Sequence, residues 1–127
     1  MTVYVETDFL LALANNSDWL QQSAEEALGE HDIETSAFSY LELLLARERY
    51  EFEYVPLVAN LLELVPVRDE EERQIVLKAV NYYDEGMTAF DAFHAATAET
   101  RTQNVLSSEK DYADIEVERV PLEPADE

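Results

Sequence analysis

Short stretches of β-branched and aromatic residues alternate with longer helix-forming stretches, and this alternation limits most strongly the folds that the chain can adopt. Segments rich in Leu, Ala and Glu favour helix, whereas β-branched and aromatic residues favour strand. The extended candidates are residues 2–5, 32–35, 65–67, 104–106 and 116–120, and the helical candidates are residues 9–14, 18–28, 38–49, 54–64, 69–83 and 88–98. Strands separated by helices predict an α/β domain with a mostly parallel sheet.

The chain length predicts one domain. Its 127 residues contain no internal repeat and no low-complexity linker. More than a quarter of them are Leu, Ile, Val or Phe, which is enough apolar surface to exclude intrinsic disorder. We therefore expect a single domain over residues 1–121, followed by an acidic C-terminal tail over residues 122–127.

The net charge is strongly negative. The 29 Asp and Glu against 8 Lys and Arg give a formal net charge of −21, which excludes a nucleic-acid binder that relies on its own basic surface. The acids are spread along the whole chain. We interpret this spread as an adaptation to a very salty cytoplasm, as in a halophile, where the Debye length is about 3 Å at 1 M salt. Repulsion of all nucleic acid is the alternative interpretation.

Several classes of protein are excluded by missing residues. The absence of cysteine excludes disulfides, thiolate metal sites and a cysteine nucleophile. No apolar run approaches the roughly 18 residues that cross a bilayer, and the N-terminus lacks the basic start of a signal peptide, so we expect a soluble cytoplasmic protein without membrane contact. With only two glycines, a Gly-rich phosphate loop is excluded as well.

A few carboxylates interrupt apolar segments or follow expected strands. In an open parallel sheet, ligands bind where the strands end at their carboxyl side. Carboxylates that converge to about 5 Å there repel by roughly 3 kcal/mol per pair at an effective dielectric of 20, so a cation or shared protons must stabilise them. The residues of this kind are Glu6, Asp8, Glu42, Asp91, Glu109 and Asp111.

Each of these residues also has a purely structural interpretation. Ser39 and Glu42 have the spacing of a helix capping box, and Thr88 and Asp91 fit that pattern loosely. Glu6 alone could be a solvent-exposed residue at the end of a strand. The sequence leaves both interpretations open.

Four motifs contain these acids, in this order along the chain: Val3-Tyr4-Val5-Glu6-Thr7-Asp8-Phe9-Leu10-Leu11, Thr35-Ser36-x-x-Ser39-Tyr40-Leu41-Glu42, Asp91-Ala92-Phe93-His94-Ala95-Ala96-Thr97-Ala98, and Val105-Leu106-Ser107-Ser108-Glu109-Lys110-Asp111-Tyr112. They resemble the four acidic motifs of PIN-domain ribonucleases, whose small single-domain members are the VapC-type toxins. The resemblance covers residues 2 to about 120. It implies a three-layer α/β/α fold with a four- or five-stranded mostly parallel sheet, and cleavage of single-stranded RNA regions that depends on Mg²⁺ or Mn²⁺.

The resemblance also assigns roles to residues. It implies catalytic acids at Glu6, Glu42, Asp91 and Glu109, with Asp111 as a nearby alternate to Glu109, and it implies metal binding by Glu6, Asp91 and Glu109, to which Asp111 and Asp8 can contribute. The family usually has Asp at the positions of Glu6 and Glu109. A small antitoxin partner and a homodimer are implied too. Arg47, Arg49 and Arg101 are candidate contacts for RNA phosphates because they are close in sequence to the motifs.

Two other functions remain as alternatives. The glutamates at two of the four acidic positions favour a PIN fold that no longer catalyses and serves as a binding or assembly module. The run Glu6-Thr7-Asp8 resembles the Asp-x-Asp motif of phosphoryl-transfer enzymes, although Glu6 replaces the nucleophilic Asp.

Overall fold

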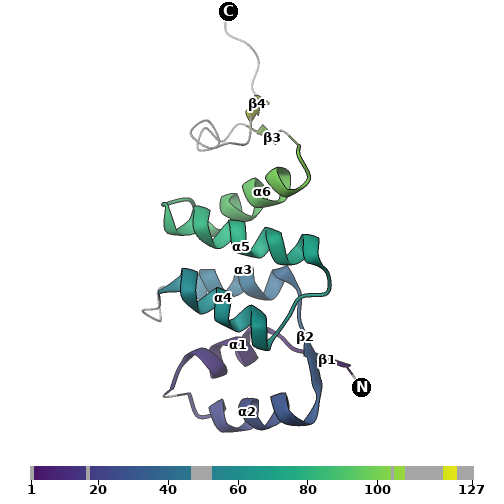
Figure 1. Ribbon diagram of the computed structural model, residues 1–127. Coiled ribbons are helices and arrows are strands. Elements are labelled where there is room, and N and C mark those ends of the chain that lie inside the picture. The colour runs from purple at the N-terminus through teal and green to yellow at the C-terminus, as the bar shows by residue number, and fades with distance from the viewer. Residues whose placement is uncertain (1, 17, 47–52, 104, 108–118, 123–127) are drawn as a thin grey trace, which may run out of the picture.

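The fold, seen in a computed structural model, consists mainly of helices (Figure 1). The structure describes residues 2–16, 18–46, 53–103, 105–107 and 119–122. The helices are α1 (Thr7–Ala14), α2 (Gln21–Glu30), α3 (Ala37–Leu45), α4 (Tyr54–Leu64), α5 (Glu70–Asp84) and α6 (Ala89–Thr100). The strands are β1 (Thr2–Tyr4), β2 (Asp32–Glu34), β3 (Val105–Ser107) and β4 (Arg119–Pro121).

The first sheet joins the N-terminal strand to the strand that follows α2. β1 pairs with β2 in parallel, with Thr2 opposite Asp32 and Tyr4 opposite Glu34. An isolated parallel bridge joins Thr35, the residue after β2, to Val67 of the predicted extended segment 65–67. The predicted parallel pairing is therefore confirmed for these segments.

The second sheet concerns the expectation of a single sheet with four or five strands, which the described strands do not confirm. β3 pairs with β4 in parallel, from Val105 opposite Arg119 to Ser107 opposite Pro121, but the described strands form two separate two-stranded sheets. Figure 1 shows β3 and β4 beyond α6, at the end of the molecule opposite α2. Each strand is only three residues long, so few backbone hydrogen bonds hold a sheet together, and helix packing dominates the architecture.

The main hydrophobic core lies between the helices. α3 contributes three fully or almost fully buried side chains, Tyr40, Leu43 and Leu44, and α1 contributes Leu10. α5 and α6 pack through small residues, with Ala79, Ala92 and Ala96 fully buried, as the alanine-rich sequence of α6 predicts. Because alanine side chains let two helix backbones approach closely, this pair packs tightly.

The helix boundaries agree only in part with the predicted ones. The Asp69 side chain accepts a hydrogen bond of 2.8 Å from the backbone N–H of Glu72 and so caps α5, which begins where the sequence predicts. α2 differs, because Leu20 is its N-cap and Asp18 instead accepts from the backbone N–H of Leu20 at 2.8 Å. Gly29 does not end α2, which continues to Glu30. In the part of the chain that the structure describes, none of the helices combines the length and apolar character needed to span a bilayer.

Candidate functional site

The first acidic motif lies between β1 and α1. Glu6 is the N-cap residue of α1, and its backbone carbonyl accepts a hydrogen bond of 3.1 Å from Phe9. The Glu6 side chain is exposed and makes no capping hydrogen bond. The Asp8 side chain, in the first turn of α1, is exposed as well. Both carboxylates follow the carboxyl end of β1, where the sequence places them.

The second motif is connected to the first by a hydrogen bond. The Thr7 hydroxyl donates to Oε1 of Glu42, which is half-buried on α3, at 2.8 Å. The same hydroxyl lies 3.3 Å from the Ser39 carbonyl oxygen. The capping-box interpretation of Glu42 is wrong, because α3 begins at Ala37 with Ser36 as its N-cap and Ser39 lies inside the helix. Glu42 is therefore oriented by the neighbouring motif.

A group of hydroxyls connects β1, β2 and α3 behind this hydrogen bond. Thr35 and Ser39 are both buried, and their hydroxyl oxygens lie 2.8 Å apart. The Thr35 hydroxyl donates to the carbonyl of Val5 at 2.7 Å. The Thr35 hydroxyl has only one proton, which this hydrogen bond uses. The Ser39 hydroxyl is therefore the donor in the hydrogen bond between Ser39 and Thr35. These bonds fix the start of α3 against the end of β1.

Tyr4 joins this group from the surface. Its phenolic oxygen lies 2.8 Å from the Ser36 hydroxyl and 3.5 Å from the Ser39 hydroxyl. The hydrogen bond from Ser36 lowers the pKa of Tyr4 below its usual value, because it stabilises the phenolate form. From the sequence, Ser39 is expected only as a helix cap, and Thr7 and Thr35 have no predicted role, although Thr7 directly follows the first acid and Ser39 is three residues before the second.

The third motif lies at the start of α6. The Thr88 hydroxyl accepts a hydrogen bond of 3.2 Å from the backbone N–H of Asp91, so Thr88 caps this helix as the sequence predicts. The Asp91 side chain is half-buried, whereas His94, one turn later, is exposed. The helix-capping interpretation is therefore confirmed for Thr88.

The helices of the first and third motifs both contact α3, the helix of the second. α3 packs against α1 and also against α6. The side chains of Glu6, Glu42 and Asp91 are carboxylates, and carboxylate oxygens are the ligands that Mg²⁺ and Mn²⁺ prefer. Within the described ranges, however, no three Asp, Glu, His or Cys side chains are grouped so that they could hold a metal ion. Glu109 and Asp111 of the fourth motif lie outside the described residues.

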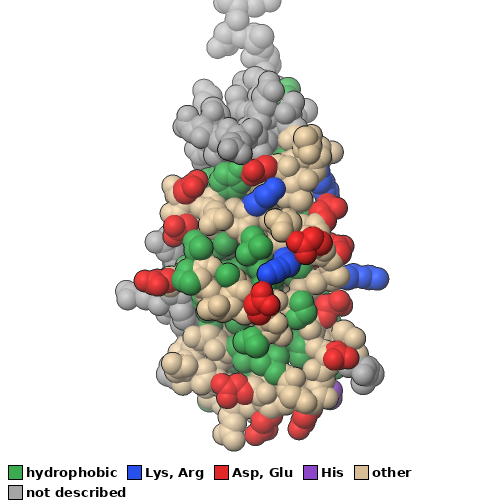
Figure 2. Space-filling view, viewed as in Figure 1, with side chains coloured by type: hydrophobic (Ala, Val, Ile, Leu, Met, Phe, Trp, Pro, Cys, Tyr) green, Lys and Arg blue, Asp and Glu red, His purple; other side chains and the backbone are tan. Residues whose placement is uncertain are grey.

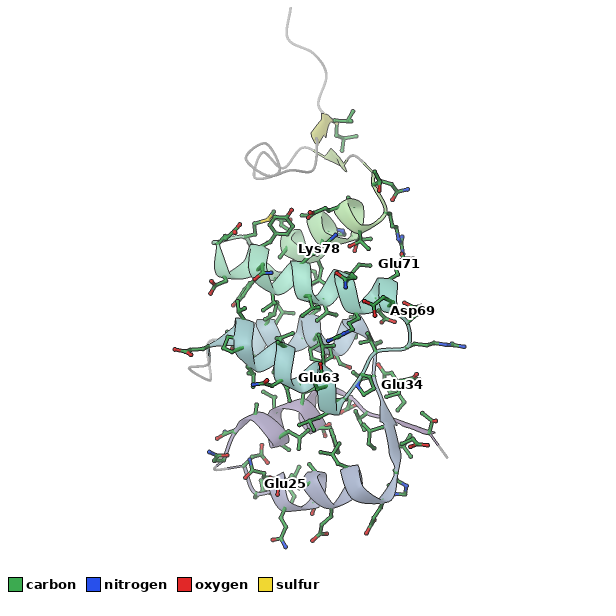
Figure 3. The ribbon with its side chains drawn as sticks, in the orientation of Figure 1. Glu25, Glu34, Glu63, Asp69, Glu71 and Lys78 are labelled. Carbon is green, nitrogen blue, oxygen red and sulfur yellow. The ribbon has the colours of Figure 1, made fainter. Side chains whose placement is uncertain are left out.

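The candidate phosphate contacts are only partly placed. Arg101 is exposed at the end of α6, and its Nε donates to Oε1 of Glu71 at 2.7 Å, so an RNA phosphate would have to compete with this carboxylate. Arg47 and Arg49 lie outside the described residues. Figure 2 shows acidic side chains at many places on the viewed face and few basic ones. The acids labelled in Figure 3 come from several parts of the fold: Glu25 from α2, Glu34 from β2, Glu63 from α4, and Asp69 and Glu71 from the start of α5.

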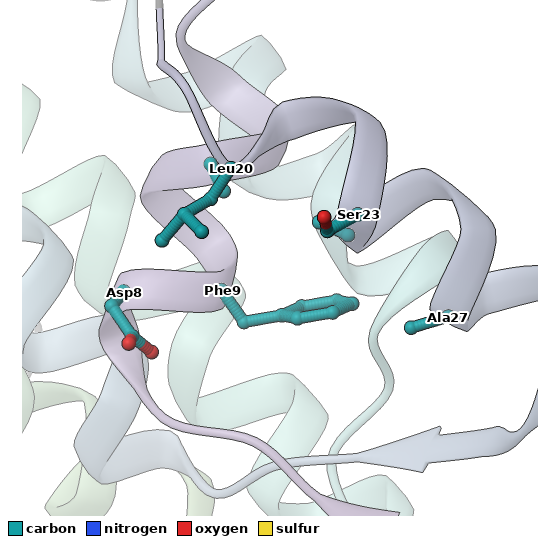
Figure 4. Close-up of a pocket in the computed structure, with 7 residues that line it drawn as sticks. Asp8, Phe9, Leu20, Ser23 and Ala27 are labelled. Atoms are coloured by element: carbon teal, nitrogen blue, oxygen red, sulfur yellow. The ribbon is translucent and has the colours of Figure 1, made fainter.

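A pocket of about 230 Å³ lies between α1 and α2, close to the first motif (Figure 4). The Phe9 ring points from α1 toward α2, and Leu20 and Ala27 line the pocket as well. Its polar side chains are Asp8 and Ser23. With one carboxylate in a mostly apolar lining, this pocket is unsuited to hold a divalent ion by itself.

Comparison with models of known protein families gives a match that covers all four acidic motifs. The sequence model of the PIN domain matches residues 3–118, which is most of the chain. No curated protein and no solved structure matches the sequence. PIN domains have an α/β fold and are commonly metal-dependent nucleases. Because the match extends from β1 past the fourth acidic motif, the chain belongs to the PIN domain family.

Proposed function

We propose that this protein is a divalent-metal-dependent endoribonuclease that hydrolyses phosphodiester bonds of RNA. The hydrogen bond of 2.8 Å from Thr7 to Glu42 carries the proposal, because it fixes a carboxylate of the second motif beside the segment of the first. The packing of α3 against α6 gives further support, since α6 carries Asp91. PIN family membership supplies the reaction class.

The proposed metal site draws on all four motifs. Glu6, Glu42 and Asp91 would supply carboxylate oxygens, with Glu109 and Asp111 from the fourth motif and Asp8 as a further ligand. Glu42 can accept the Thr7 hydrogen bond and still bind a cation, because a carboxylate has about four lone-pair sites. A bound Mg²⁺ or Mn²⁺ ion supplies a Lewis acid that activates water and neutralises charge on the phosphate. In this protein it would also offset the repulsion between acidic residues and an acidic substrate.

The test is cleavage of a structured RNA by the purified protein in concentrated KCl with Mn²⁺ or Mg²⁺. We expect Asp91→Asn and Glu6→Gln to reduce the rate by more than about 100-fold, because loss of groups that only support metal ligands already costs about 10- to 100-fold. Glu25→Gln is the matched control, since it removes the same charge from an exposed position on α2. Equal rates in all four proteins would contradict the proposal.

The single sheet implied by the family also belongs to this proposal. If β3 lies beside β1 in a four- or five-stranded sheet with helices on both sides, the fourth motif approaches Glu6, because parallel strands end at the same edge. The chain has no cysteine, so a Val3→Cys/Leu106→Cys double variant can form a disulfide only where these strands are neighbours. Efficient crosslinking would support the single sheet. A failure to crosslink would favour the two separate sheets of Figure 1.

We further propose that the nuclease is the cytoplasmic toxin of a toxin–antitoxin pair and that it forms a homodimer. Small PIN nucleases that act on RNA often pair with antitoxins, and the length of this chain is typical of them. Expression of the protein alone should arrest growth, and the Asp91→Asn variant should not. A small protein encoded by the neighbouring reading frame should copurify with it and restore growth.

A catalytically weakened PIN module is the second candidate. The observation that favours it is that Glu6, Glu42 and Asp91 are not gathered into a three-residue metal site in the described part of the chain. Thermal unfolding with increasing Mn²⁺ separates the two functions. The melting temperature of a nuclease should rise with the Mn²⁺ concentration, because the ion binds the folded state. The melting temperature of the module should stay the same at all Mn²⁺ concentrations.

A further inference from the structure

The exposed aromatic side chains of this protein are found mainly beside the acidic motifs. Among the described residues, four aromatic side chains are exposed: Tyr4 (59%), Trp19 (86%), Phe38 (63%) and Phe90 (55%). Three of these four flank a motif carboxylate in the sequence. Tyr4 is two residues before Glu6, Phe38 is four residues before Glu42, and Phe90 directly precedes Asp91.

Tyr4 and Phe38 lie at the same end of α3. The Tyr4 hydroxyl forms a hydrogen bond of 2.8 Å with the Ser36 hydroxyl, and Ser36 is the N-cap of the helix. Phe38 is in the first turn, and residues four apart on a helix are surface neighbours, so it lies beside Glu42. We call these two residues the Tyr4–Phe38 patch.

The charged groups at this end of α3 are unfavourable for phosphate. A carboxylate oxygen of Glu72 accepts a hydrogen bond of 2.5 Å from the backbone N–H of Ala37, so this N–H is already bound to an anion. Arg73, the neighbour of Glu72, forms an ion pair of 3.2 Å with Glu63. With Glu42 as a second carboxylate nearby, attraction for RNA at this patch has to come from uncharged contacts.

We propose that Tyr4 and Phe38 stack on unpaired bases of single-stranded RNA beside the acidic site. This inference takes the identity of the ligand, RNA, from the proposed function. Stacking suits this surface because every base has a π-face that an exposed aromatic ring can cover, and because stacking is a contact between uncharged groups. The two side chains thereby act as specificity-determining residues, since the bases of a duplex are not available for stacking.

Binding, measured apart from cleavage, tests the inference. All proteins carry Asp91→Asn to suppress cleavage, and the probe is a fluorescently labelled single-stranded oligoadenylate of about ten nucleotides, followed by anisotropy in concentrated KCl with Mn²⁺. We expect Phe38→Ala and Tyr4→Ala each to weaken binding by about 5-fold or more, because alanine substitution at a stacked base typically costs about 1–3 kcal/mol. Tyr4→Phe and Phe38→Tyr keep the rings and should bind like the parent protein.

Trp19→Ala is the control, because it removes an exposed aromatic ring from the segment between α1 and α2. It should not change affinity. An abasic oligonucleotide of the same length should bind weakly and should not discriminate between the parent protein and Phe38→Ala. Phe38 is largely exposed, so this variant should fold even if Tyr4→Ala does not.

Three results would overturn the inference. The first is an abasic oligonucleotide that binds as tightly as oligoadenylate, and the second is unchanged binding by Phe38→Ala and Tyr4→Ala. The third is conversion of a dimer to a monomer by Phe38→Ala, which would assign the patch to a second copy of the chain. Failure of the proposed function gives a different result. In that case the unmutated protein leaves RNA intact with Mn²⁺, while base-dependent binding by the patch remains.

Discussion

At the scale of single residues, the most informative contact is the one between Thr7 and Glu42. Thr7 follows the first motif acid directly, and its hydroxyl lies 2.8 Å from Oε1 of the second. A hydrogen bond to a carboxylate fixes the direction in which the carboxylate oxygens point. The remaining lone pairs of these oxygens stay available to a cation. Thr7 is therefore a positioning residue in the proposed nuclease.

We expect Thr7→Val to lower Mn²⁺-dependent cleavage and Mn²⁺ affinity by about 10- to 100-fold, because groups that orient metal ligands typically contribute this much. Thr7→Ser keeps the hydroxyl and should restore most of both quantities. Calorimetric titration with Mn²⁺ and initial cleavage rates measure them. A loss of thermal stability with unchanged Mn²⁺ affinity would assign Thr7 a structural role only.

Tyr40 is the residue that connects α3 to the segment after α4. Its side chain is fully buried, and its hydroxyl donates to the carbonyl of Val65 at 2.8 Å. Tyr40→Phe leaves that buried carbonyl without this donor and should lower the free energy of unfolding by about 1–3 kcal/mol. Urea denaturation measures the change. Full stability in the variant would contradict the assigned role.

Tyr40 also predicts a pH dependence. Burial raises the pKa of Tyr40 above the ordinary 10.0, because the charged phenolate is disfavoured in the core. The unfolded chain then releases this proton at lower pH than the folded one, so stability is fully present below about pH 10 and falls as the pH rises further. Tyr40→Phe should show a smaller fall above pH 10, measured as urea midpoints against pH.

At the scale of elements, the start of α3 depends on a helix far away in the sequence. The N-cap Ser36 makes no side-chain capping hydrogen bond, and Glu72 in the first turn of α5 accepts the hydrogen bond from Ala37 instead. A negative charge at the positive end of α3 is favourable, and the same carboxylate lies in the first turn of its own helix. α3 and α5 are thereby connected at their N-terminal ends.

We expect Glu72→Ala to lower the free energy of unfolding by about 1.5–3 kcal/mol, the usual contribution of a hydrogen bond to a charged group. Glu70→Ala is the control, since Glu70 is exposed and is also in the first turn of α5. It should cost less, about 0.3–1 kcal/mol, because it alters the interaction with the helix dipole and one solvent-exposed hydrogen bond from the Gln74 side chain. Equal losses from the two substitutions would show that the contact with Ala37 contributes nothing.

At the scale of the whole molecule, the dominant feature is the net charge of −21. The labelled acids of Figure 3 lie from α2 to the start of α5, so repulsion acts between several elements of the fold. Dissolved ions screen such repulsion within a Debye length, which falls from about 10 Å at 0.1 M to about 3 Å at 1 M. We propose that concentrated salt is the condition in which this protein is most stable.

We expect the melting temperature to rise by at least about 5 °C between 0.1 M and 1 M KCl, which corresponds to roughly 1 kcal/mol for a domain of this size. Most of the rise should occur below 1 M, because screening saturates once the Debye length is shorter than the spacing of the charges. A melting temperature that stays constant between 0.1 M and 1 M KCl would argue against screening as the cause. A rise that begins only above 1 M would do the same.

The sequence by itself determined the order of strands and helices, the start of α5 near residue 69, the cap at Thr88 and the four acidic motifs. These features depend on residues close together in the chain, so local propensity and spacing predict them. Only the tertiary structure decided that Glu42 accepts from Thr7 and that Glu72 binds the start of α3, since each contact joins residues 35 apart. The pairing of the described strands, β1 with β2 and β3 with β4, was not predictable either, because strands of three residues carry no signal that specifies their partners.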